Sequence, residues 1–201
     1  MMKNIIFDLG NVLIKFSPEN FMKKYVAEEN REKFFNVVFK SREWAELDRG
    51  TLSYDEVIRI FSEGVPEEKE AVKILFDHKI MDTLSPIEEN IGIMRELKKN
   101  NYSVYILSNF HQPAFEYIKE NWDFIKEFNG GIVSCYCHYL KPQAEIYKLI
   151  LKKYNLDPKE TIFIDDTLIN VTGCEEQGIT GIHLYTPEAL KELLFKHKIV
   201  F

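Results

Sequence analysis

Thr161-Ile162-Phe163-Ile164-Asp165-Asp166 is a short apolar run that ends in two carboxylates. Ile5-Ile6-Phe7-Asp8, near the start of the chain, has the same form. In both, the apolar residues are continuous rather than alternating with polar ones, which is typical of parallel strands buried on both faces. Further runs predict strands of the same kind: Val104-Tyr105-Ile106-Leu107, Ile132-Val133 and Ile182-His183-Leu184-Tyr185.

Helical patterns lie between these runs. Ser85-Pro86-Ile87-Glu88 has the form of a capping box with proline at the first helical position. Apolar residues then recur at helical spacing, here and in two later segments: Ile87, Ile91, Met94 and Leu97; Ile146, Leu149 and Ile150; Leu190, Leu193 and Leu194. Strands that alternate with helices indicate an α/β fold with a Rossmann-like, doubly wound parallel sheet.

Residues 16–84 interrupt this alternation, because they contain helical patterns and no convincing strand. We therefore expect an all-helical insertion at 16–84, within a core formed by residues 1–15 and 85–201. Ser17-Pro18 and Ser85-Pro86 are the expected hinges between the two parts.

The composition limits the classes of function. The chain of 201 residues has 26 basic and 32 acidic residues, a net charge of −6, which argues against nucleic acid or an anionic membrane as the main partner. No stretch approaches the roughly 20 apolar residues of a membrane-spanning helix, and the N-terminus lacks the apolar run of a signal peptide. Three cysteines, an odd and small number, suit a reducing compartment, so we expect a cytoplasmic protein.

Polar residues follow the predicted strands where each strand ends. Asp8, Ser108-Asn109 and Asp165-Asp166 come directly after apolar runs, and Lys141 follows shortly after another. Any one of them alone is more often a turn or capping residue. Because the carboxyl ends of parallel strands meet at one edge of the sheet, we expect them to lie together there. Carboxylates suit Mg²⁺, and hydroxyl, amide and ammonium groups can hold a phosphoryl group, so the set predicts phosphoryl transfer.

Four motifs in order resemble those of the haloacid dehalogenase-like (HAD) hydrolases over essentially the whole chain. They are Phe7-Asp8-Leu9-Gly10-Asn11-Val12-Leu13; Leu107-Ser108-Asn109; Lys141-Pro142 followed by Glu145-Ile146-Tyr147; and Phe163-Ile164-Asp165-Asp166 followed by Gly178-Ile179. The helical insertion falls where one class of this family carries a cap domain. The chain looks most like the sugar-phosphate phosphatase branch, which implies a Mg²⁺-dependent phosphatase for a small phosphorylated metabolite, a sugar phosphate by this likeness.

The resemblance also implies roles for single residues. Asp8 would be the nucleophile, forming an aspartyl-phosphate, and a Mg²⁺ ligand. Gly10 would give its backbone carbonyl to the metal, and Asp166 would be the second carboxylate ligand. Ser108 would hold the phosphoryl group through its hydroxyl, with Asn109 beside it.

The remaining motif residues would support this centre. Lys141 would neutralise Asp8 and the phosphoryl oxygens. Asp165 and Asn170 would act behind the ligands or through metal-bound water. Trp44 and Asp48 lie between helices of the insertion, where related enzymes place loops that face the substrate, and His111 follows the second motif closely enough to face the same pocket.

One position departs from the family pattern. The family usually has an aspartate two residues after the nucleophile, acting as general acid and base, and here this residue is Gly10. General acid–base assistance contributes about 10²–10⁴-fold to a rate. Three interpretations of Gly10 are open. The enzyme acts on esters with good leaving groups, or another residue supplies the proton, with His111, His138 and Asp48 as candidates by position. In the third, the protein hydrolyses esters slowly or not at all.

Other functions remain open at this stage. A haloacid dehalogenase also uses an aspartate nucleophile but needs no metal, which the Asp165-Asp166 pair disfavours. A phosphonate hydrolase would need a Schiff-base lysine in the insertion, for which Lys23 and Lys24 are available. A module that only binds a ligand is the non-enzymatic alternative, because of Gly10. The sequence gives neither the substrate, nor the choice between monomer and homodimer, nor that between Mg²⁺ and Mn²⁺.

Overall fold

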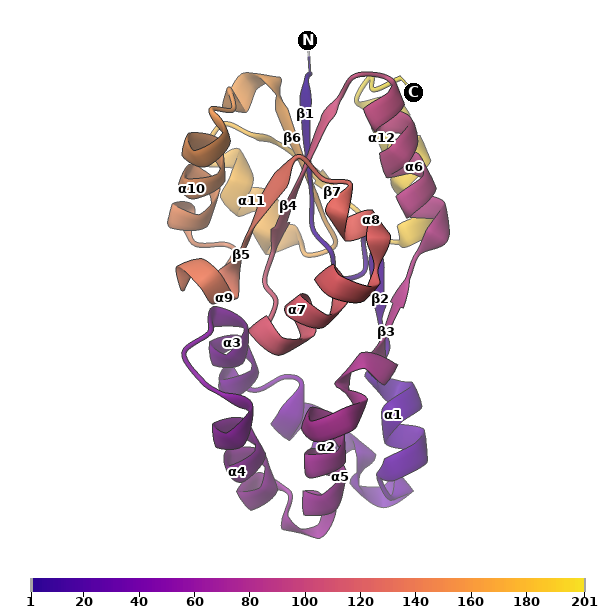
Figure 1. The fold of residues 1–201 in the computed structure, drawn as a ribbon, viewed down its shortest axis with the longest axis vertical. Coiled ribbons are helices and arrows are strands. Elements are labelled where there is room, and N and C mark those ends of the chain that lie inside the picture. Colours follow the sequence, from indigo (N-terminus) through magenta and orange to yellow (C-terminus); the bar gives the residue numbers. More distant parts are fainter. Residues whose placement is uncertain (1, 201) are drawn as a thin grey trace.

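The computed structural model describes residues 2–200 and contains a five-stranded parallel sheet (Figure 1). Its strands, in the order β5-β4-β1-β6-β7, are β1 (Asn4–Phe7), β4 (Ser103–Ser108), β5 (Gly130–Val133), β6 (Thr161–Asp165) and β7 (Thr180–His183). Every strand predicted from an apolar run is present. The predicted doubly wound α/β class is therefore confirmed.

Helices cover both faces of this sheet, which explains the continuous apolar runs. Ile5 and Phe7 pack into the core on one face and Ile6 into the core on the other, as the alternation of side chains along a strand requires. The first face is covered by α6 (Glu88–Lys99), α7 (Gln112–Asn121), α8 (Asp123–Lys126) and α12 (Leu190–Lys196). The second is covered by α10 (Ala144–Tyr154) and α11 (Leu168–Glu175).

The register of the strands brings the predicted site residues together. Phe7 pairs with Ile106 of β4 on one side and with Ile164 of β6 on the other. Asp8 follows Phe7, so it stands level with the ends of both neighbouring strands. Strand β1 lies in the middle of the sheet, with β4 and β5 on one side and β6 and β7 on the other. In doubly wound sheets, ligands usually bind in the crevice at the point where the strand order reverses in this way.

Residues 18–83, which lie between β1 and β4 in the chain, form a separate lobe, lowest in Figure 1. We call residues 18–83 the helical unit. It contains α1 (Pro18–Tyr25), α2 (Arg31–Val38), α3 (Arg42–Arg49), α4 (Tyr54–Gly64) and α5 (Lys69–Ile74), with short turns of 3₁₀ or π helix between and after them. These helices bury a core of their own, which includes Phe21, Phe34, Leu47, Phe61 and Phe76.

A small antiparallel ribbon joins the two lobes, and the sequence did not predict it. Strand β2 (Ile14–Phe16) pairs with β3 (Leu84–Pro86). The predicted capping box at Ser85 is wrong, because Ser85 pairs with Lys15 in this ribbon and α6 begins only at Glu88. The proposed division of the chain at residues 15/16 and 84/85 falls inside the ribbon and stays a prediction.

Among residues 2–200, no helix has the length and apolar character needed to cross a membrane. The cytoplasmic location and the monomeric or homodimeric state stay predictions.

Candidate active site

Asp8 is a buried carboxylate that directly follows β1. It is 7% exposed, and its Oδ1 accepts hydrogen bonds from the hydroxyl of Ser108 at 2.6 Å and the backbone N–H of Leu9 at 2.7 Å. The same oxygen lies 2.9 Å from Nζ of Lys141. Burial, with a smaller contribution from the charge of Asp165, raises the pKa of Asp8 to about 6, although Lys141 and Ser108 favour its ionised form.

Lys141 joins two carboxylates in the interior. Its side chain is 1% exposed, and Nζ lies 2.6 Å from Oδ2 of Asp165 as well as 2.9 Å from Asp8. Burial alone would lower the pKa of this ammonium, but the two carboxylates together raise it above its ordinary value. Lys141 is therefore a fixed positive charge beside Asp8.

The side chain of Asn109 clamps the backbone of Lys141. Its Oδ1 accepts from the Lys141 N–H at 2.9 Å, and its Nδ2 donates to the Lys141 carbonyl at 3.1 Å. Asn109, which we predicted to lie beside a phosphoryl group, is thus hydrogen-bonded to the backbone of Lys141.

The two aspartates after β6 differ in their surroundings. Asp165 is fully buried, and besides Lys141 it accepts hydrogen bonds from the Thr167 N–H at 2.8 Å and from Nδ2 of Asn170 at 3.0 and 3.2 Å. Asn170 is itself held at its carbonyl by the buried Tyr147 hydroxyl, 2.8 Å away. Asp166 is partly exposed and lines the cavity described below.

Oxygen atoms of Asp8, Asp165 and Asp166 all lie within 4.8 Å of one another. Because the oxygens of Asp165 already accept from Lys141, Thr167 and Asn170, Asp8 and Asp166 are the carboxylates better able to accept a cation. Gly10 lines the same cavity. Clustered carboxylates with one balancing ammonium are a donor set that fits a hard divalent cation.

A cavity of about 230 Å³ opens over these carboxylates, between the strand ends and the helical unit. Trp44, Asp48 and His111, predicted to face a substrate, all line it. The rest of its lining combines the apolar Phe16, Ile80, Leu84 and Phe110 with the polar Asn11, Thr83, Asn109 and Thr167.

His111 is buried at the start of α7 and is held by the helical unit. Its Nδ1 is hydrogen-bonded to the Tyr54 hydroxyl at 3.0 Å, and its ring packs edge-on against Trp44 with 5.5 Å between centroids. Burial lowers the pKa of His111 to about 3, so its imidazole is neutral at physiological pH.

Asp48 enters the cavity from the last turn of α3. Burial raises the pKa of its carboxyl to about 7, the charge of Asp8 adds to this, and a hydrogen bond from the backbone N–H of His111 opposes it. A carboxyl with this pKa can hold or release a proton near neutrality.

Three site residues had no predicted role. Asn11, at a left-handed φ of 50°, donates from Nδ2 to Oδ2 of Asp166 at 3.0 Å and accepts the Phe16 N–H at Oδ1. Thr167 and Tyr54 hold Asp165 and His111, as described above. Only Asn11 gave a usable signal, as an asparagine in the turn directly after the nucleophile candidate, because asparagine tolerates that backbone conformation.

Other candidates lie elsewhere. Among the described residues, the cavity lining does not include His138, Lys23 or Lys24. His138 is bonded through Nδ1 to the carbonyl of Arg49, and both lysines are exposed on α1.

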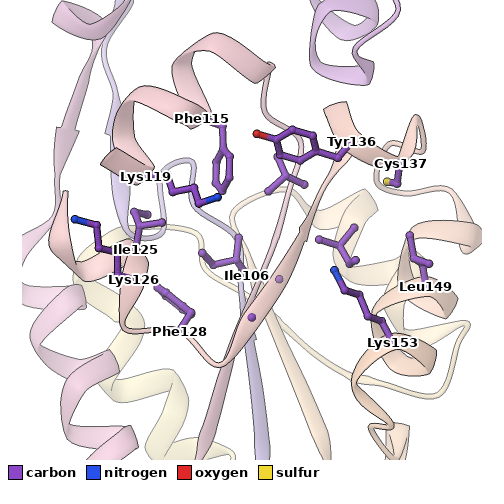
Figure 2. Close-up of a pocket in the computed structure, with 14 residues that line it drawn as sticks. Ile106, Phe115, Lys119, Ile125, Lys126, Phe128, Tyr136, Cys137, Leu149 and Lys153 are labelled. Carbon is purple, nitrogen blue, oxygen red and sulfur yellow. The ribbon is translucent and has the colours of Figure 1, made fainter. Parts of the chain in front are cut away.

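Figure 2 shows a larger groove, of about 510 Å³, beside β5. The side chains that line it include Ile106, Phe115, Phe128, Lys119, Lys126 and Lys153. None of the residues predicted for the site lines this groove, whereas Asp8, Asp48, His111 and Asp166 line the smaller cavity.

Comparisons with known proteins agree with this arrangement. A family model described as a haloacid dehalogenase-like hydrolase matches residues 2–178. The chain is 28% identical over 185 residues to a sesquiterpene phosphatase of Aspergillus oryzae, covering 90% of this chain and 89% of that protein. It is 25% identical over 201 residues to a D-ribitol-5-phosphate phosphatase of Bacteroides thetaiotaomicron, covering 89% of each.

A solved structure of a HAD family enzyme from Bacteroides thetaiotaomicron, a mutant in complex with magnesium and inorganic phosphate, shares the fold with a TM-score of 0.73. The match covers 90% of this chain and 93% of that one at 23% identity.

Proposed function

Because the chain belongs to the haloacid dehalogenase-like hydrolase family, we propose that it is a Mg²⁺-dependent phosphatase for small phosphate monoesters. The observation that carries the proposal is the environment of Asp8. This buried carboxylate stands at the sheet's carboxyl edge with Ser108 and Lys141 on one oxygen and two further carboxylates within 4.8 Å. Both phosphatases named above as relatives support the same reaction class.

The residues that would hold Mg²⁺ are Asp8, Asp166 and the backbone carbonyl of Gly10. The bound ion would supply positive charge that offsets the phosphoryl oxygens and the attacking carboxylate. Asp165 would act indirectly, because Lys141, Thr167 and Asn170 already occupy its oxygens. Asn11 would orient Asp166 through its 3.0 Å hydrogen bond.

Asp8 would attack phosphorus and form an aspartyl-phosphate, which water then hydrolyses. Lys141 would keep a positive charge beside the phosphoryl group throughout, because its raised pKa prevents loss of its proton near neutrality. The hydroxyl of Ser108 donates to Asp8 here and can rotate to donate to a phosphoryl oxygen once that group is present.

The placement of the lysines argues against a phosphonate hydrolase. A Schiff-base mechanism needs a lysine in the cavity, and Lys23 and Lys24 are exposed on α1 instead. A dehalogenase needs no metal, so dehalogenase activity would not account for the cluster of three carboxylates.

The wall of the cavity bears on the substrate. Our sequence-based prediction is a sugar phosphate. The cavity lining, however, includes aromatic and aliphatic side chains, among them Phe16, Trp44 and Leu84. These side chains favour esters with an apolar organic part, since contact with them would bury apolar surface of the ester.

The test is phosphate release from a panel of esters, with Mg²⁺ and with EDTA. The panel pairs sugar and polyol phosphates with alkyl, prenyl and aryl phosphates of similar size. We expect Mg²⁺-dependent release that is lost in Asp8→Asn. Release that survives both EDTA and Asp8→Asn would contradict the proposal, and a preference for polyol phosphates would restore the sugar-phosphate prediction.

A further inference from the structure

The core leaves space where the usual acid/base aspartate would stand. A Cβ added to Gly10 would have only Oδ2 of Asp8 nearby, at 4.0 Å. Gly10 does not have a positive φ either. Neither backbone conformation nor crowding therefore requires glycine at this position, and an acid could be accommodated there. The reaction proposed above still needs a proton for the leaving group and a base for water.

Among the described residues that line the cavity, the titratable side chains are Asp8, Asp48, His111 and Asp166. Asp8 is the proposed nucleophile, and Asp166 is a proposed metal ligand. His111 is neutral, with one ring nitrogen bonded to Tyr54, and it does not gain a proton near neutrality. Asp48 is the one group left to exchange a proton.

The end of α3 that carries Asp48 is fastened to the core. The carbonyl of Asp48 accepts a hydrogen bond from the buried Ser134 hydroxyl at 2.5 Å. Arg49 donates to the His138 carbonyl at 3.0 Å and to Gln143 Oε1 at 2.9 Å.

The next residue shows how closely the two lobes approach. Gly50, at a φ of 77°, lies so near the core backbone that a Cβ would be 2.5 Å from the carbonyl oxygen of Cys135. Figure 1 shows α3 directly beneath α9 (Ser134–Cys137). This contact holds the end of α3 beside the cavity that Asp48 and Asp8 both line.

The electrostatic surroundings suit a proton carrier. The groups that act on Asp48 come from both lobes: Asp8, Lys141, His111 and Cys135 from the core, and Tyr54 from α4. Burial and Asp8 favour its protonated form, whereas Lys141 and the N–H of His111 favour the ionised form. Burial raises the pKa of Tyr54 and Cys135, so both stay neutral near pH 7.

We propose that Asp48 is the general acid and general base of the reaction, delivered to the site by the helical unit in place of the residue missing at Gly10. This inference rests on the proposed phosphatase activity. The catalytic set would then be complete only when α3 is seated on α9.

The reaction would proceed in two steps. Asp8 bonds to phosphorus, the bond from phosphorus to the ester oxygen breaks, and the Asp48 carboxyl gives its proton to that oxygen, which releases the alcohol. The Asp48 carboxylate then takes a proton from water as the water oxygen bonds to phosphorus and the bond to Asp8 breaks. Phosphate leaves, and Asp48 again holds a proton.

The test compares the wild type with Asp48→Asn on two esters in Mg²⁺, one with an alkyl leaving group and one with the good leaving group p-nitrophenolate. For the alkyl ester we expect kcat to fall by about 10²–10⁴-fold. For p-nitrophenyl phosphate we expect a burst of p-nitrophenolate followed by slow turnover, because the first step needs no acid and the second still needs the base. Asp55→Asn, at an exposed carboxylate of α4, is the matched control and should behave as the wild type.

Rescue separates catalysis from damage to the fold. Gly10→Asp added to Asp48→Asn should restore at least about tenfold of the alkyl-ester activity and remove the burst. If the wild type hydrolyses the alkyl ester and Asp48→Asn does so equally fast, the inference is overturned and the phosphatase proposal stands. Loss of both esters without a burst, unrescued by Gly10→Asp, also overturns the inference. If the wild type hydrolyses neither ester, the proposed function itself fails.

Discussion

Replacing Lys141 with methionine removes the one positive charge between two buried carboxylates. The ammonium lies 2.9 Å from Asp8 and 2.6 Å from Asp165, and the three side chains are 1%, 10% and 0% exposed. Breaking a buried ion pair from one side costs about 3–5 kcal/mol, because the remaining charge is left without compensation. That is a large part of the roughly 5–15 kcal/mol that stabilises a typical domain.

The cost of this substitution should depend on pH in a defined direction. Without Lys141, the pKa of Asp8 rises further above the value of about 6 that it has in the wild type. A raised carboxyl pKa means that the folded state binds the proton more tightly than the unfolded chain. The associated stability is complete below the ordinary pKa of 3.8 and is lost as the pH rises through the folded-state pKa. The deficit of Lys141→Met should therefore be larger at pH 8 than at pH 5.

Urea unfolding in EDTA measures this, since EDTA keeps a divalent cation from replacing the lost charge. The control is Lys126→Met, which removes an ion pair to Asp123 of similar length, 3.0 Å, between side chains that are 55% and 92% exposed. It should cost less than about 1 kcal/mol at both pH values. If Lys141→Met also costs less than about 1 kcal/mol, equally at pH 5 and pH 8, the description of a buried, charge-balanced centre is wrong.

Three other substitutions test neighbouring parts of the site. Folding raises the pKa of Asp48 from 3.8 to about 7, so ionising this carboxyl above pH 7 costs the folded state free energy. Asp48→Asn removes that cost, so it should stabilise the protein at pH 8 by at most about 4 kcal/mol and have little effect at pH 4. Urea titrations at both pH values check this. Arg49→Ala removes two hydrogen bonds that hold α3 on the core, so it should lower kcat by tenfold or more while changing the free energy of unfolding by only about 1 kcal/mol. Kinetics and urea unfolding measure the two effects, and a loss of stability with kcat unchanged would contradict this role. Asn11→Ala should weaken Mg²⁺ binding about 10–100-fold, because it frees Asp166; calorimetry showing unchanged affinity would remove Asn11 from the site.

The sheet was predictable because its strands are buried on both faces. Continuous apolar runs such as Ile5-Ile6-Phe7 are a strong signal, and because the carboxyl ends of parallel strands share one edge, they also predict that Asp8 lies near Asp165. The ribbon of β2 and β3 was missed because three-residue strands are too short to show a period. The sequence around Ser85 fits a capping box, but pairing with Lys15 prevailed over that local preference.

The site was less predictable where it depends on contacts between distant segments. Asn11 and Asp166 are 155 residues apart, and nothing in either stretch shows that their side chains meet. The seating of α3 on α9 is likewise a property of the folded chain, in which Arg49 reaches His138 and Gln143. Asp48 was one of several candidates by position, and its place in the cavity lining, from which His138 is absent among the described residues, distinguishes the two.

Detection of a phosphoryl group on Asp8 is the most direct test of the account. The protein is mixed with a phosphate ester and Mg²⁺, quenched in acid within one turnover, digested and examined by mass spectrometry. We expect one phosphoryl group on the peptide that contains Asp8, more of it in Asp48→Asn supplied with p-nitrophenyl phosphate, and none in Asp8→Asn. Burst-phase release of p-nitrophenolate with no phosphoryl group on that peptide would contradict the nucleophilic role of Asp8.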